Sequence, residues 1–546
     1  MPKMTGGKAV VEALKQAGVE IVFGLPGVQI MGIFDAFFGE PDVKLITVRH
    51  EQTAVYMADG YARVKGKPGV ALVVPGPGVQ NASAALGTAY ACSSPVLLIA
   101  GQVESYHLGQ DRGALHEIND QLDIVRPVTK WCQRVMRVRD IPQAIQEAMR
   151  QMNTGRPRPT EIEIPWDVVG KEEEVSFPRK EEFSRKSPPL EDIKKAARLL
   201  LEAKKPLIWG GGGVILANAS RELKELAEIL KAPVATTPEG KGAFPESHAL
   251  SLGGGYYGFG SVRYLSSAAD VILAVGTRLT GQMRPGTAPK ENQKLIHIDA
   301  DANLFNKNFP AEVAIAADAK EALRILIEEL GQGKFVSKSS WTEEEMQAAK
   351  NKHRQWLKRK APLQTEIIET IRNKVPQETI LISGVTNIGY WCNLAYPVEL
   401  PRTYFTSSYF ATLGYAFPTG LGAKVAAPDK PVIAVVGDGG FMYAMPDLAT
   451  AVKYGINLIT LVFNDQAFGS TKCDQQINFQ GRIIGTDLQN PDFTEVAKLF
   501  GAKGIKTSPE KLGRVLEEAL SADRPVVIEI PVPTMIAPFQ ISPLED

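Results

Sequence analysis

Short apolar runs alternate with helical patterns along most of the chain. In the first part, the run GVALVV is followed by the loop PGPGVQN, the small-residue stretch ASAALGTAYA and the run PVLLIAG. The last part repeats this order with PVIAVV, GDGGFMY, DLATAVKYG and NLITLVF. Runs rich in Val, Ile and Leu between helices are typical of parallel sheets that are buried on both faces. The pattern predicts an α/β protein whose first and last parts are similar domains.

Two polar stretches divide the chain into three parts of domain size. Residues 170–192 are charged and contain prolines, whereas residues 331–362 begin as a polar segment and continue as a charged helical pattern. The middle part contains PLIWGGGGVI, ADVILAVGTRL and KLIHIDAD, which also have the pattern of buried strands that lead into loops. We therefore expect three doubly wound parallel-sheet domains, at residues 1–170, 190–332 and 360–535.

The composition of the 546 residues, 44% hydrophobic and 22% charged, is that of an ordinary globular protein. Lys plus Arg and Asp plus Glu both number 61, so the formal charge of zero gives no support to nucleic-acid or membrane-surface binding. The four cysteines have no paired spacing, and the N-terminal segment lacks the apolar core of a signal peptide. We expect a cytoplasmic protein with reduced thiols that binds neither nucleic acid nor a membrane.

Two acidic residues follow two of the apolar runs. Asp438 stands in a Gly-Asp-Gly loop after residues 431–436, and Asp465 comes two residues after the end of the run 457–463. The helical pattern between the runs predicts a right-handed crossover, so the two strands should be parallel neighbours about 5 Å apart. Their carboxyl ends would then place both acids at the edge where open α/β sheets bind ligands.

Two carboxylates so close together would repel each other unless a cation lies between them. Mg²⁺ and Ca²⁺ take oxygen ligands, and Mg²⁺ commonly combines one or two carboxylates with phosphate oxygens. The Gly-rich loop and the helix that follows add backbone N–H donors for a phosphate. Either acid alone would suit a tight turn or a helix cap, but the matched pair predicts a metal–diphosphate site.

The spacing of this pair resembles the cofactor motif of thiamine-diphosphate enzymes: Gly-Asp-Gly, 24 intervening residues and then Asn. In that family the motif Asp, a second Asn or Asp side chain and a nearby backbone carbonyl hold Mg²⁺. The resemblance assigns these roles to Asp438, Asp465 and the carbonyl of Ala467. Many relatives have Asn-Asn where this chain has Asn464 and Asp465, and the Asp keeps the oxygen ligand. The loop glycines expected at the cofactor are Gly437, Gly439 and Gly440.

A distant stretch supplies an acid for the other end of such a cofactor. KLITVRH has the pattern of a strand and EQTAVYMADGYARV that of a helix, so Glu51 falls at a strand's carboxyl edge. Alone, Glu51 would only complement the helix dipole. However, RHEQTAVYMADGYAR resembles the pyrimidine-domain motif of the acetolactate synthase group. There the Glu contacts the pyrimidine N1′ and promotes the tautomer that deprotonates the thiazolium C2. The resemblance implies this catalytic role for Glu51.

Further stretches resemble the same family. FGLPGVQIMGIFDA resembles its N-terminal loop, and PGPGVQN resembles the loop that lines the pyrimidine pocket. SSYFATLGYAFPTGLGAKVA resembles the segment whose bulky apolar residue bends the cofactor, and ISGVTNIGYW resembles the loop before that segment. The resemblance runs from about residue 1 to 535. It implies a pyrimidine-binding domain, a central nucleotide-binding-like domain and a diphosphate-binding domain, in that order. The additional cofactor contacts that it implies are Gly27, Pro77, Asn81, Val385, Thr386 and Leu413.

The substrate is less well defined by the sequence. Acetolactate synthases, which decarboxylate a 2-oxo acid and then join two carbonyl carbons, commonly have this layout. This chain departs from them at two places: their Phe-Gln-Glu segment is Leu-His-Glu here, and the stretch GSTKCDQ lacks their specificity Trp. NDQLDIVRPVTKW and GTDLQNPDF look more like benzaldehyde lyase, which cleaves and forms 2-hydroxy ketones. The site His of that enzyme falls on Gln29. Gln29 and His116 are therefore the predicted substrate residues. Glyoxylate carboligase is disfavoured because it lacks the Glu, and pyruvate decarboxylase because its paired histidines are absent.

The resemblance also bears on cofactors and partners. The stretch GTRLTGQM replaces the family's usual FAD contacts, which makes FAD doubtful. In relatives the cofactor lies between the catalytic Glu of one chain and the Gly-Asp-Gly motif of another, so we expect a homodimer or homotetramer. Two other classes stay open: a nucleotide-binding oxidoreductase using the glycines at 210–213, which lack the full G-x-G-x-x-G spacing, and a degenerate cofactor-binding protein without turnover. Residues 470–490 are polar and are expected to form a surface loop.

Overall fold

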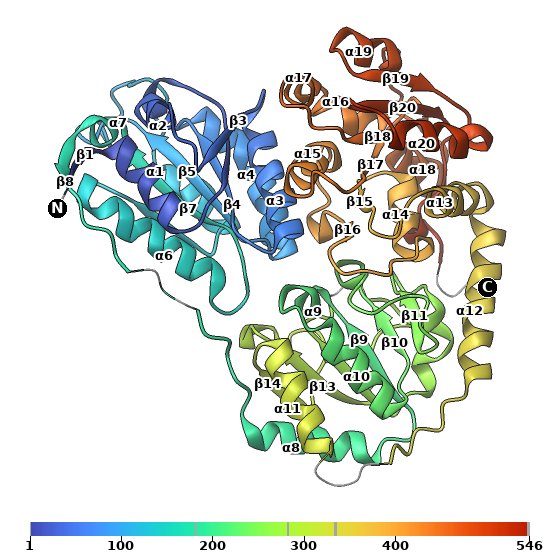
Figure 1. Ribbon diagram of the computed structural model, residues 1–546. Helices are drawn as coiled ribbons and strands as arrows, with labels where there is room; N and C mark the ends of the chain where they lie inside the picture. Colours follow the sequence, from blue (N-terminus) through green and yellow to red (C-terminus); the bar gives the residue numbers. More distant parts are fainter. Residues whose placement is uncertain (1, 180, 182, 281–282, 332–335, 543–546) are drawn as a thin grey trace.

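The computed structural model describes residues 2–179, 181, 183–280, 283–331 and 336–542. Figure 1 shows three bodies, with the first (blue) and the third (orange to red) side by side and the central one (green) next to both. Each contains a six-stranded sheet in which every pair of neighbouring strands is parallel. The predicted fold class, three parallel-sheet α/β domains, is confirmed.

The sheets of the first and third domains have the same strand order. The order is β3-β2-β4-β5-β7-β6 in the first and β16-β15-β17-β18-β20-β19 in the third, which is second, first, third, fourth, sixth and fifth along each sheet's own sequence. This shared order supports the prediction that the two domains are similar. The strands are β2 (Ile21–Gly24), β3 (Lys44–Thr47), β4 (Gly69–Val73), β5 (Val96–Gln102), β6 (Trp131–Arg134), β7 (Thr160–Pro165), β15 (Ile380–Ser383), β16 (Tyr404–Phe405), β17 (Val432–Gly437), β18 (Ile459–Asn464), β19 (Lys503–Lys506) and β20 (Val526–Pro531).

The central sheet has a different order, β11-β10-β9-β12-β13-β14. This is the strand order of dinucleotide-binding folds, which bind their ligand where the order reverses, here between β9 and β12. Its strands are β9 (Pro206–Gly210), β10 (Val234–Thr236), β11 (Ser251–Gly254), β12 (Val271–Val275), β13 (Lys294–Asp299) and β14 (Val313–Ala316).

Helices cover the sheets on both faces, as alternating strands and helices require. In the first domain they are α1 (Gly6–Gln16), α2 (Met31–Ala36), α3 (Glu51–Lys65), α4 (Pro77–Cys92), α5 (Gln121–Val125), α6 (Ile141–Asn153) and α7 (Trp166–Gly170). The central domain has α8 (Leu190–Glu202), α9 (Gly212–Leu216), α10 (Ser220–Leu230) and α11 (Ala319–Gly331). The third has α13 (Pro362–Lys374), α14 (Asn387–Ala395), α15 (Ala416–Ala426), α16 (Asp438–Met442), α17 (Leu448–Lys453), α18 (Gly469–Asn478), α19 (Phe493–Leu499) and α20 (Leu512–Leu520).

One hydrophobic core spans the first and third domains, and each of them also has a core cluster on the other face of its sheet. Separate clusters fill the central domain. Helices α3 and α15 form the centre of the shared core, and their backbones touch. A Cβ at Gly422 of α15 would overlap the carbonyl oxygen of Met57 in α3. Small residues at this crossing therefore allow a close contact that any side chain would block.

The two predicted connecting stretches contain regular structure. Residues 170–192 begin with β8 (Glu172–Glu174), which pairs antiparallel with β1 (Lys3–Thr5) and ties the start of the connection to the first domain. The charged helical pattern forms α12 (Glu343–Lys360), whose N-terminus is capped by Thr342. In Figure 1 this helix runs beside the central domain and reaches the third domain at its C-terminal end, near α13. Within the described ranges, no helix is both long and apolar enough to cross a membrane.

Candidate active site

The two acids predicted to bind metal lie at one edge of the third sheet. Strands β17 and β18 are parallel neighbours, with Gly437 opposite Phe463. Asp438 directly follows β17 and begins α16, and Asp465 directly follows β18. Burial, followed by the charge of Asp465, raises the pKa of Asp438 to about 6, and burial raises the pKa of Asp465 as well. A buried and a half-buried carboxylate that repel each other fit a hard divalent cation.

Asn490 joins the first of these acids to the neighbouring strand. Its Nδ2 donates to Asp438 Oδ2 at 2.6 Å and to Asn464 Oδ1 at 3.3 Å, and Asn464 donates to Glu529 Oε1 at 3.0 Å. Because Asn464 is bonded to these neighbours, Asp465 is the side chain at the end of β18 that remains for a cation. The sequence analysis missed Asn490, since its only signal is its place in the polar stretch GTDLQNPDF.

The backbone at Ala467 lies in a segment that is held in place from both sides. Ala467 forms an isolated antiparallel bridge with Asp487, and α18 begins two residues after Ala467. The expectation of a surface loop over residues 470–490 is therefore wrong for its first half. A Cβ at Gly469 would overlap the Asp465 carboxylate, so any larger residue here would displace the side chain of this acid.

The ligand set offered here is two carboxylates and backbone oxygen. Among the residues described, His, Cys, Asp and Glu side chains form no group of three that could hold a metal ion. A cation between Asp438 and Asp465 would need the carbonyl of Ala467 and further oxygens, such as those of a phosphate. This is the donor set that the sequence predicts, and it fits Mg²⁺ with a bound diphosphate.

The other predicted cofactor residues of the third domain border the same loop. A Cβ at Gly437 would lie 2.9 Å from Thr386 Oγ1, and one at Gly440 would have the Gly414 nitrogen as its nearest neighbour, at 3.8 Å. Without side chains, the glycines at the start of α16 let a phosphate approach the backbone closely. The predicted residues that flank or belong to this loop are Val385, Thr386, Leu413, Gly437, Gly439 and Gly440.

Glu51 and Asn81 meet in the first domain as a directly bonded pair. Glu51 is the first residue of α3 and only 8% exposed, and Asn81 Nδ2 of α4 donates to its Oε2 at 3.0 Å. The backbone N–H of Arg49, just before α3, donates to Asp447 Oδ1 of the third domain at 2.8 Å. Pro77 is the first residue of α4, one helical turn before Asn81. The junction between β3 and α3 is thus held by a hydrogen bond from α4 and by another to the third domain. Glu51 is the only acid in the first turn of α3.

The predicted substrate residues lie around the turn that precedes α4. Gln29 is 1% exposed, and its Nε2 donates to the carbonyl of Leu115 at 3.0 Å. A Cβ at Gly76 would lie 2.5 Å from the carbonyl oxygen of His116, so the turn and the His116 segment are in contact. Gly27 lies two residues before Gln29, and a Cβ there would overlap a neighbouring valine side chain. The structure thus brings Gln29 and His116 to the same place.

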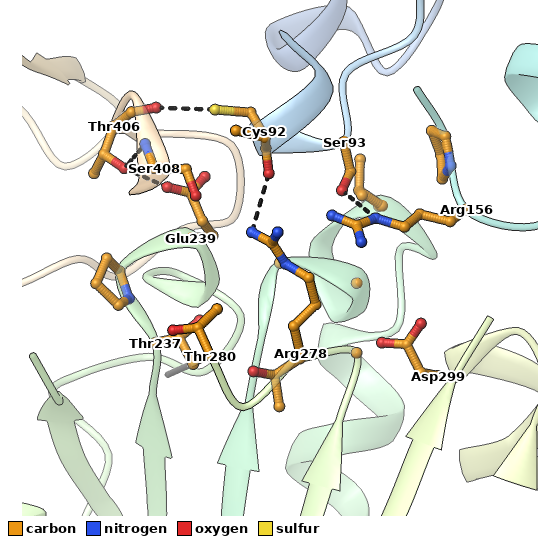
Figure 2. Close-up of a pocket in the computed structure, with 18 of the residues that line it drawn as sticks. Cys92, Ser93, Arg156, Thr237, Glu239, Arg278, Thr280, Asp299, Thr406 and Ser408 are labelled. Atoms are coloured by element: carbon orange, nitrogen blue, oxygen red, sulfur yellow. Dashed lines mark hydrogen bonds between the residues drawn. The ribbon is translucent and has the colours of Figure 1, made fainter. Parts of the chain in front are cut away.

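A cavity of about 650 Å³ lies between the domains, at the reversal point of the central sheet. Its lining includes the glycines that begin α9, which the sequence analysis singled out, and residues 276–280. Figure 2 shows two arginines beside it: Arg278 Nη2 donates to the Ala91 carbonyl at 3.1 Å, and Arg156 Nε donates to Ser93 Oγ at 2.8 Å. Burial lowers the pKa of Arg156 to about 10. The lining also includes Glu239, Asp299 and Asp318, and the groups in it that suit an anionic ligand are the two arginines and the glycine backbone.

Three family models match the chain in sequence order. The N-terminal TPP binding domain of thiamine pyrophosphate enzymes matches residues 4–124, the central domain matches residues 193–326, and the C-terminal TPP binding domain matches residues 384–530. Thiamine pyrophosphate is another name for thiamine diphosphate. The matched regions contain the Glu51 pair, the central sheet and the Asp438 edge respectively.

Curated proteins are similar over almost the whole length. The chain is 35% identical to a probable acetolactate synthase large subunit of Methanocaldococcus jannaschii, over 96% of this chain and 92% of that protein. It is 33% identical to the acetolactate synthase isozyme 3 large subunit of Escherichia coli, over 96% and 93%. It is also 33% identical to a probable 2-ketoarginine decarboxylase of Pseudomonas aeruginosa, over 91% and 88%.

The chain belongs to the thiamine pyrophosphate enzyme family, within the acetolactate synthase group. It is a thiamine-diphosphate-dependent enzyme. The predicted family and enzyme class are thus confirmed, and the individual site residues stay predictions.

Proposed function

We propose that this protein is a Mg²⁺- and thiamine-diphosphate-dependent carboligase that breaks and forms carbon–carbon bonds at a carbonyl carbon, as an acetolactate synthase does. Its substrates would be 2-oxo acids or 2-hydroxy ketones, with decarboxylation preceding carboligation. The observation that carries the proposal is the retention of both ends of the site: the buried Glu51–Asn81 pair and the paired acids Asp438 and Asp465. A protein that only bound the cofactor would not need Glu51.

The roles of the residues follow from their positions. Asp438, Asp465 and the carbonyl of Ala467 would hold Mg²⁺, and the glycines at the start of α16 would hold a diphosphate through backbone N–H groups. When bound, thiamine diphosphate supplies a nucleophilic carbon and an electron sink. Glu51 would exchange a proton with the pyrimidine ring, and Asn81 would hold the carboxylate in place through its 3.0 Å hydrogen bond.

A second candidate function is cleavage of 2-hydroxy ketones to aldehydes, as in benzaldehyde lyase. It is favoured by the stretches NDQLDIVRPVTKW and GTDLQNPDF, which resemble that enzyme, and by His116, which replaces the Gln of the acetolactate synthase segment Phe-Gln-Glu. Gln29 stands where benzaldehyde lyase has its site His, so the proton-transfer residue would differ from that enzyme's. A degenerate cofactor-binding protein without turnover is the remaining alternative. Assays with defined substrates separate the three.

We also propose that a second copy of the chain completes the site, in a cytoplasmic homodimer or homotetramer. Apolar side chains are exposed next to both halves of the site: Val28 and Leu115 beside the Gly76 turn, and Met442 and Tyr443 after the Asp438 loop. Exposed apolar side chains at such positions are typical of surfaces that another subunit covers. Light scattering of the purified protein measures the assembly directly.

The central cavity is proposed to hold a nucleotide-like anion, and FAD is not expected to be required. The stretch that replaces the family's FAD contacts lines this cavity with residues 276–280 and Met283, while residues 281 and 282 lie outside the described residues. Absorbance of the purified protein near 450 nm tests for a bound flavin.

The deciding experiment is incubation with thiamine diphosphate, Mg²⁺ and either pyruvate or benzoin. Formation of CO₂ and acetolactate from pyruvate is the expected result. Benzaldehyde from benzoin, without pyruvate turnover, would transfer the assignment to the hydroxy-ketone lyase. If the protein binds the cofactor but turns over neither substrate nor any other 2-oxo acid, the result would support a degenerate cofactor-binding protein without activity.

A further inference from the structure

Gln121, the first residue of α5, joins three segments around the turn at Gly76. It is completely buried, and each polar atom of its amide is bonded. Its Oε1 accepts from the backbone N–H of Gly76 at 2.9 Å. Its Nε2 donates to the carbonyl of Gly101 at 3.0 Å and to Glu163 Oε2 at 2.8 Å. None of the roles assigned above uses this residue.

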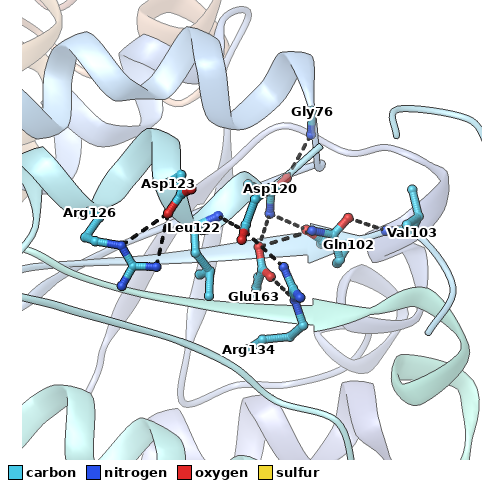
Figure 3. Close-up of polar contacts among 11 residues, drawn as sticks. Gly76, Gln102, Val103, Asp120, Leu122, Asp123, Arg126, Arg134 and Glu163 are labelled. Atoms are coloured by element: carbon cyan, nitrogen blue, oxygen red, sulfur yellow. Dashed lines mark hydrogen bonds and ion pairs between the residues drawn. The ribbon is translucent and has the colours of Figure 1, made fainter. Parts of the chain in front are cut away.

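Glu163 fixes which way the Gln121 amide points. Figure 3 shows Glu163 between Gln102, which donates to it at 3.2 Å, and Arg134, whose Nε donates to Oε1. Glu161, two residues earlier on β7, is also buried, and its carboxyl oxygens have no hydrogen-bond partner in the described part of the chain. Burial raises the pKa of both acids. Glu163 accepts from three N–H donors, one of them the Arg134 guanidinium, whereas Glu161 has none, so the contacts favour the charged form at Glu163.

An ionised Glu163 accepts hydrogen bonds only, so it forces the NH₂ end of Gln121 towards itself. The carbonyl end of the amide then faces Gly76. This acceptor satisfies a backbone N–H that is buried in a turn with a positive φ of 56°. A buried N–H left without a partner destabilises the folded state, so the bond constrains the turn.

The turn leads directly into the Glu51 pair. Gly76 is the N-cap of α4, and its carbonyl accepts from the Gln80 N–H at 3.0 Å, which sets the first turn of the helix. Asn81 follows immediately and donates to Glu51. A continuous series of contacts therefore joins Glu163, through Gln121 and the Gly76 turn, to Asn81, which donates to Glu51.

We propose that Gln121, oriented by Glu163, is a positioning residue that sets the start of α4 and thereby the Asn81–Glu51 pair; this rests on the proposed role of Glu51. The matched control is Gln102. It donates to the same Glu163 oxygen, but its Oε1 accepts from the N–H of Val103 rather than from the Gly76 turn. Replacing either glutamine removes one donor from Glu163, and only one replacement releases the turn.

The first test needs neither cofactor nor substrate. Hydrogen–deuterium exchange of the peptide spanning residues 74–81 is compared in wild type, Gln121→Leu and Gln102→Leu. We expect exchange at the turn to rise about tenfold or more in Gln121→Leu and to stay near wild type in Gln102→Leu. Equal behaviour of the two variants would overturn the positioning role.

The second test measures deuterium exchange at the thiazolium C2 of bound thiamine diphosphate, which depends on Glu51 and not on the identity of the substrate. Gln121→Leu is expected to slow this exchange about tenfold or more at every pH, with thiamine-diphosphate affinity changed much less. Gln121→Glu places a second carboxyl against Glu163. Its exchange rate relative to wild type should fall as pH rises from 6 to 9, because the added carboxyl loses its donor proton.

The outcomes separate the two proposals. Wild-type C2 exchange with no turnover of any substrate would count against the carboligase and not against Gln121. An unchanged C2 rate in Gln121→Leu, or an equal loss in Gln102→Leu, would refute the role of Gln121. If Gln121→Leu does not fold, Gln121→Glu gives the comparison, because at low pH its protonated carboxyl has the shape of the amide and keeps one donor for Glu163. A C2 rate in this variant that does not fall relative to wild type as the pH rises would then refute the role of Gln121.

Discussion

Replacing Asp438 with Asn tests the electrostatics of the proposed metal edge without any substrate. Asp438 is buried beside Asp465, and its pKa is raised from 3.8 to about 6. At about 1.36 kcal/mol per pH unit, this rise corresponds to about 3 kcal/mol that the ionised carboxylate costs the folded apoprotein. Asp465 is only half-buried, so solvent screens part of the repulsion and we expect about 1–2 kcal/mol.

The pH dependence of this cost has a definite sign. The folded state binds the Asp438 proton more tightly than the unfolded state does, so the cost is absent below about pH 4, grows as the pH rises to about 6, and is constant above that. Asp438→Asn removes the charge and keeps an oxygen that can accept the 2.6 Å hydrogen bond from Asn490. The apoprotein variant should therefore unfold at a higher temperature than wild type at pH 8, by about 1–3 °C, and the difference should shrink towards pH 5.

Thermal unfolding in EDTA measures the cost of the Asp438 charge in the apoprotein. Repeating it with Mg²⁺ and thiamine diphosphate measures the stabilisation that the bound ligands provide. Ligands that bind only the folded state raise its stability, by about 2.7 kcal/mol at a hundred times Kd. Wild type should gain this stabilisation and Asp438→Asn should lose most of it. Asp429→Asn, at an exposed acid of the same domain, should change neither midpoint. A lower apoprotein midpoint for Asp438→Asn, or equal ligand stabilisation in both proteins, would refute the reasoning.

Three further changes give expected outcomes. Glu51→Gln should retain thiamine-diphosphate binding by calorimetry and lose turnover by about 10²–10⁴-fold, the usual range for a general acid–base group; unchanged turnover would sink the mechanism. Asn81→Leu removes the 3.0 Å bond to Glu51 and should lower kcat by about tenfold with a smaller change in KM, as steady-state kinetics would show. Gly422→Ala would overlap the Met57 carbonyl and should destabilise the fold by about 3 kcal/mol, whereas Gly170→Ala, with nothing within 4 Å of its Cβ, should leave the melting temperature unchanged.

The parts of the site that follow strand ends could be predicted from the sequence. Asp438 and Asp465 come directly after strands, and Glu51 begins the helix that follows β3 after three residues. Parallel strands bring their carboxyl ends to one edge of each sheet without further information. The sequence predicted only that Asn81 and Glu51 lie near the same cofactor, whereas the structure shows a direct hydrogen bond between their side chains.

The residues that were missed act through buried polar contacts between segments far apart in sequence. Asn490 reaches Asp438 over 52 positions, and Gln121 reaches Glu163 over 42. No periodicity marks such residues, because a single amide that fills a hydrogen-bonding gap looks like any polar residue of a loop. The helix α18 was missed for a related reason: its sequence GSTKCDQQIN is polar, and its only buried residue is Cys473.

The shared core of the first and third domains has a consequence for synthesis on the ribosome. Helix α3 is complete at Lys65, but the helix that covers it, α15, begins only at Ala416. Roughly 350 residues must be added between the two, which takes about 20–70 s at typical translation rates. During that time the apolar face of α3 stays exposed, because the helix that packs against it has not yet been synthesised. A segment of this kind is where a chaperone would bind, and where newly made chains would associate if none did.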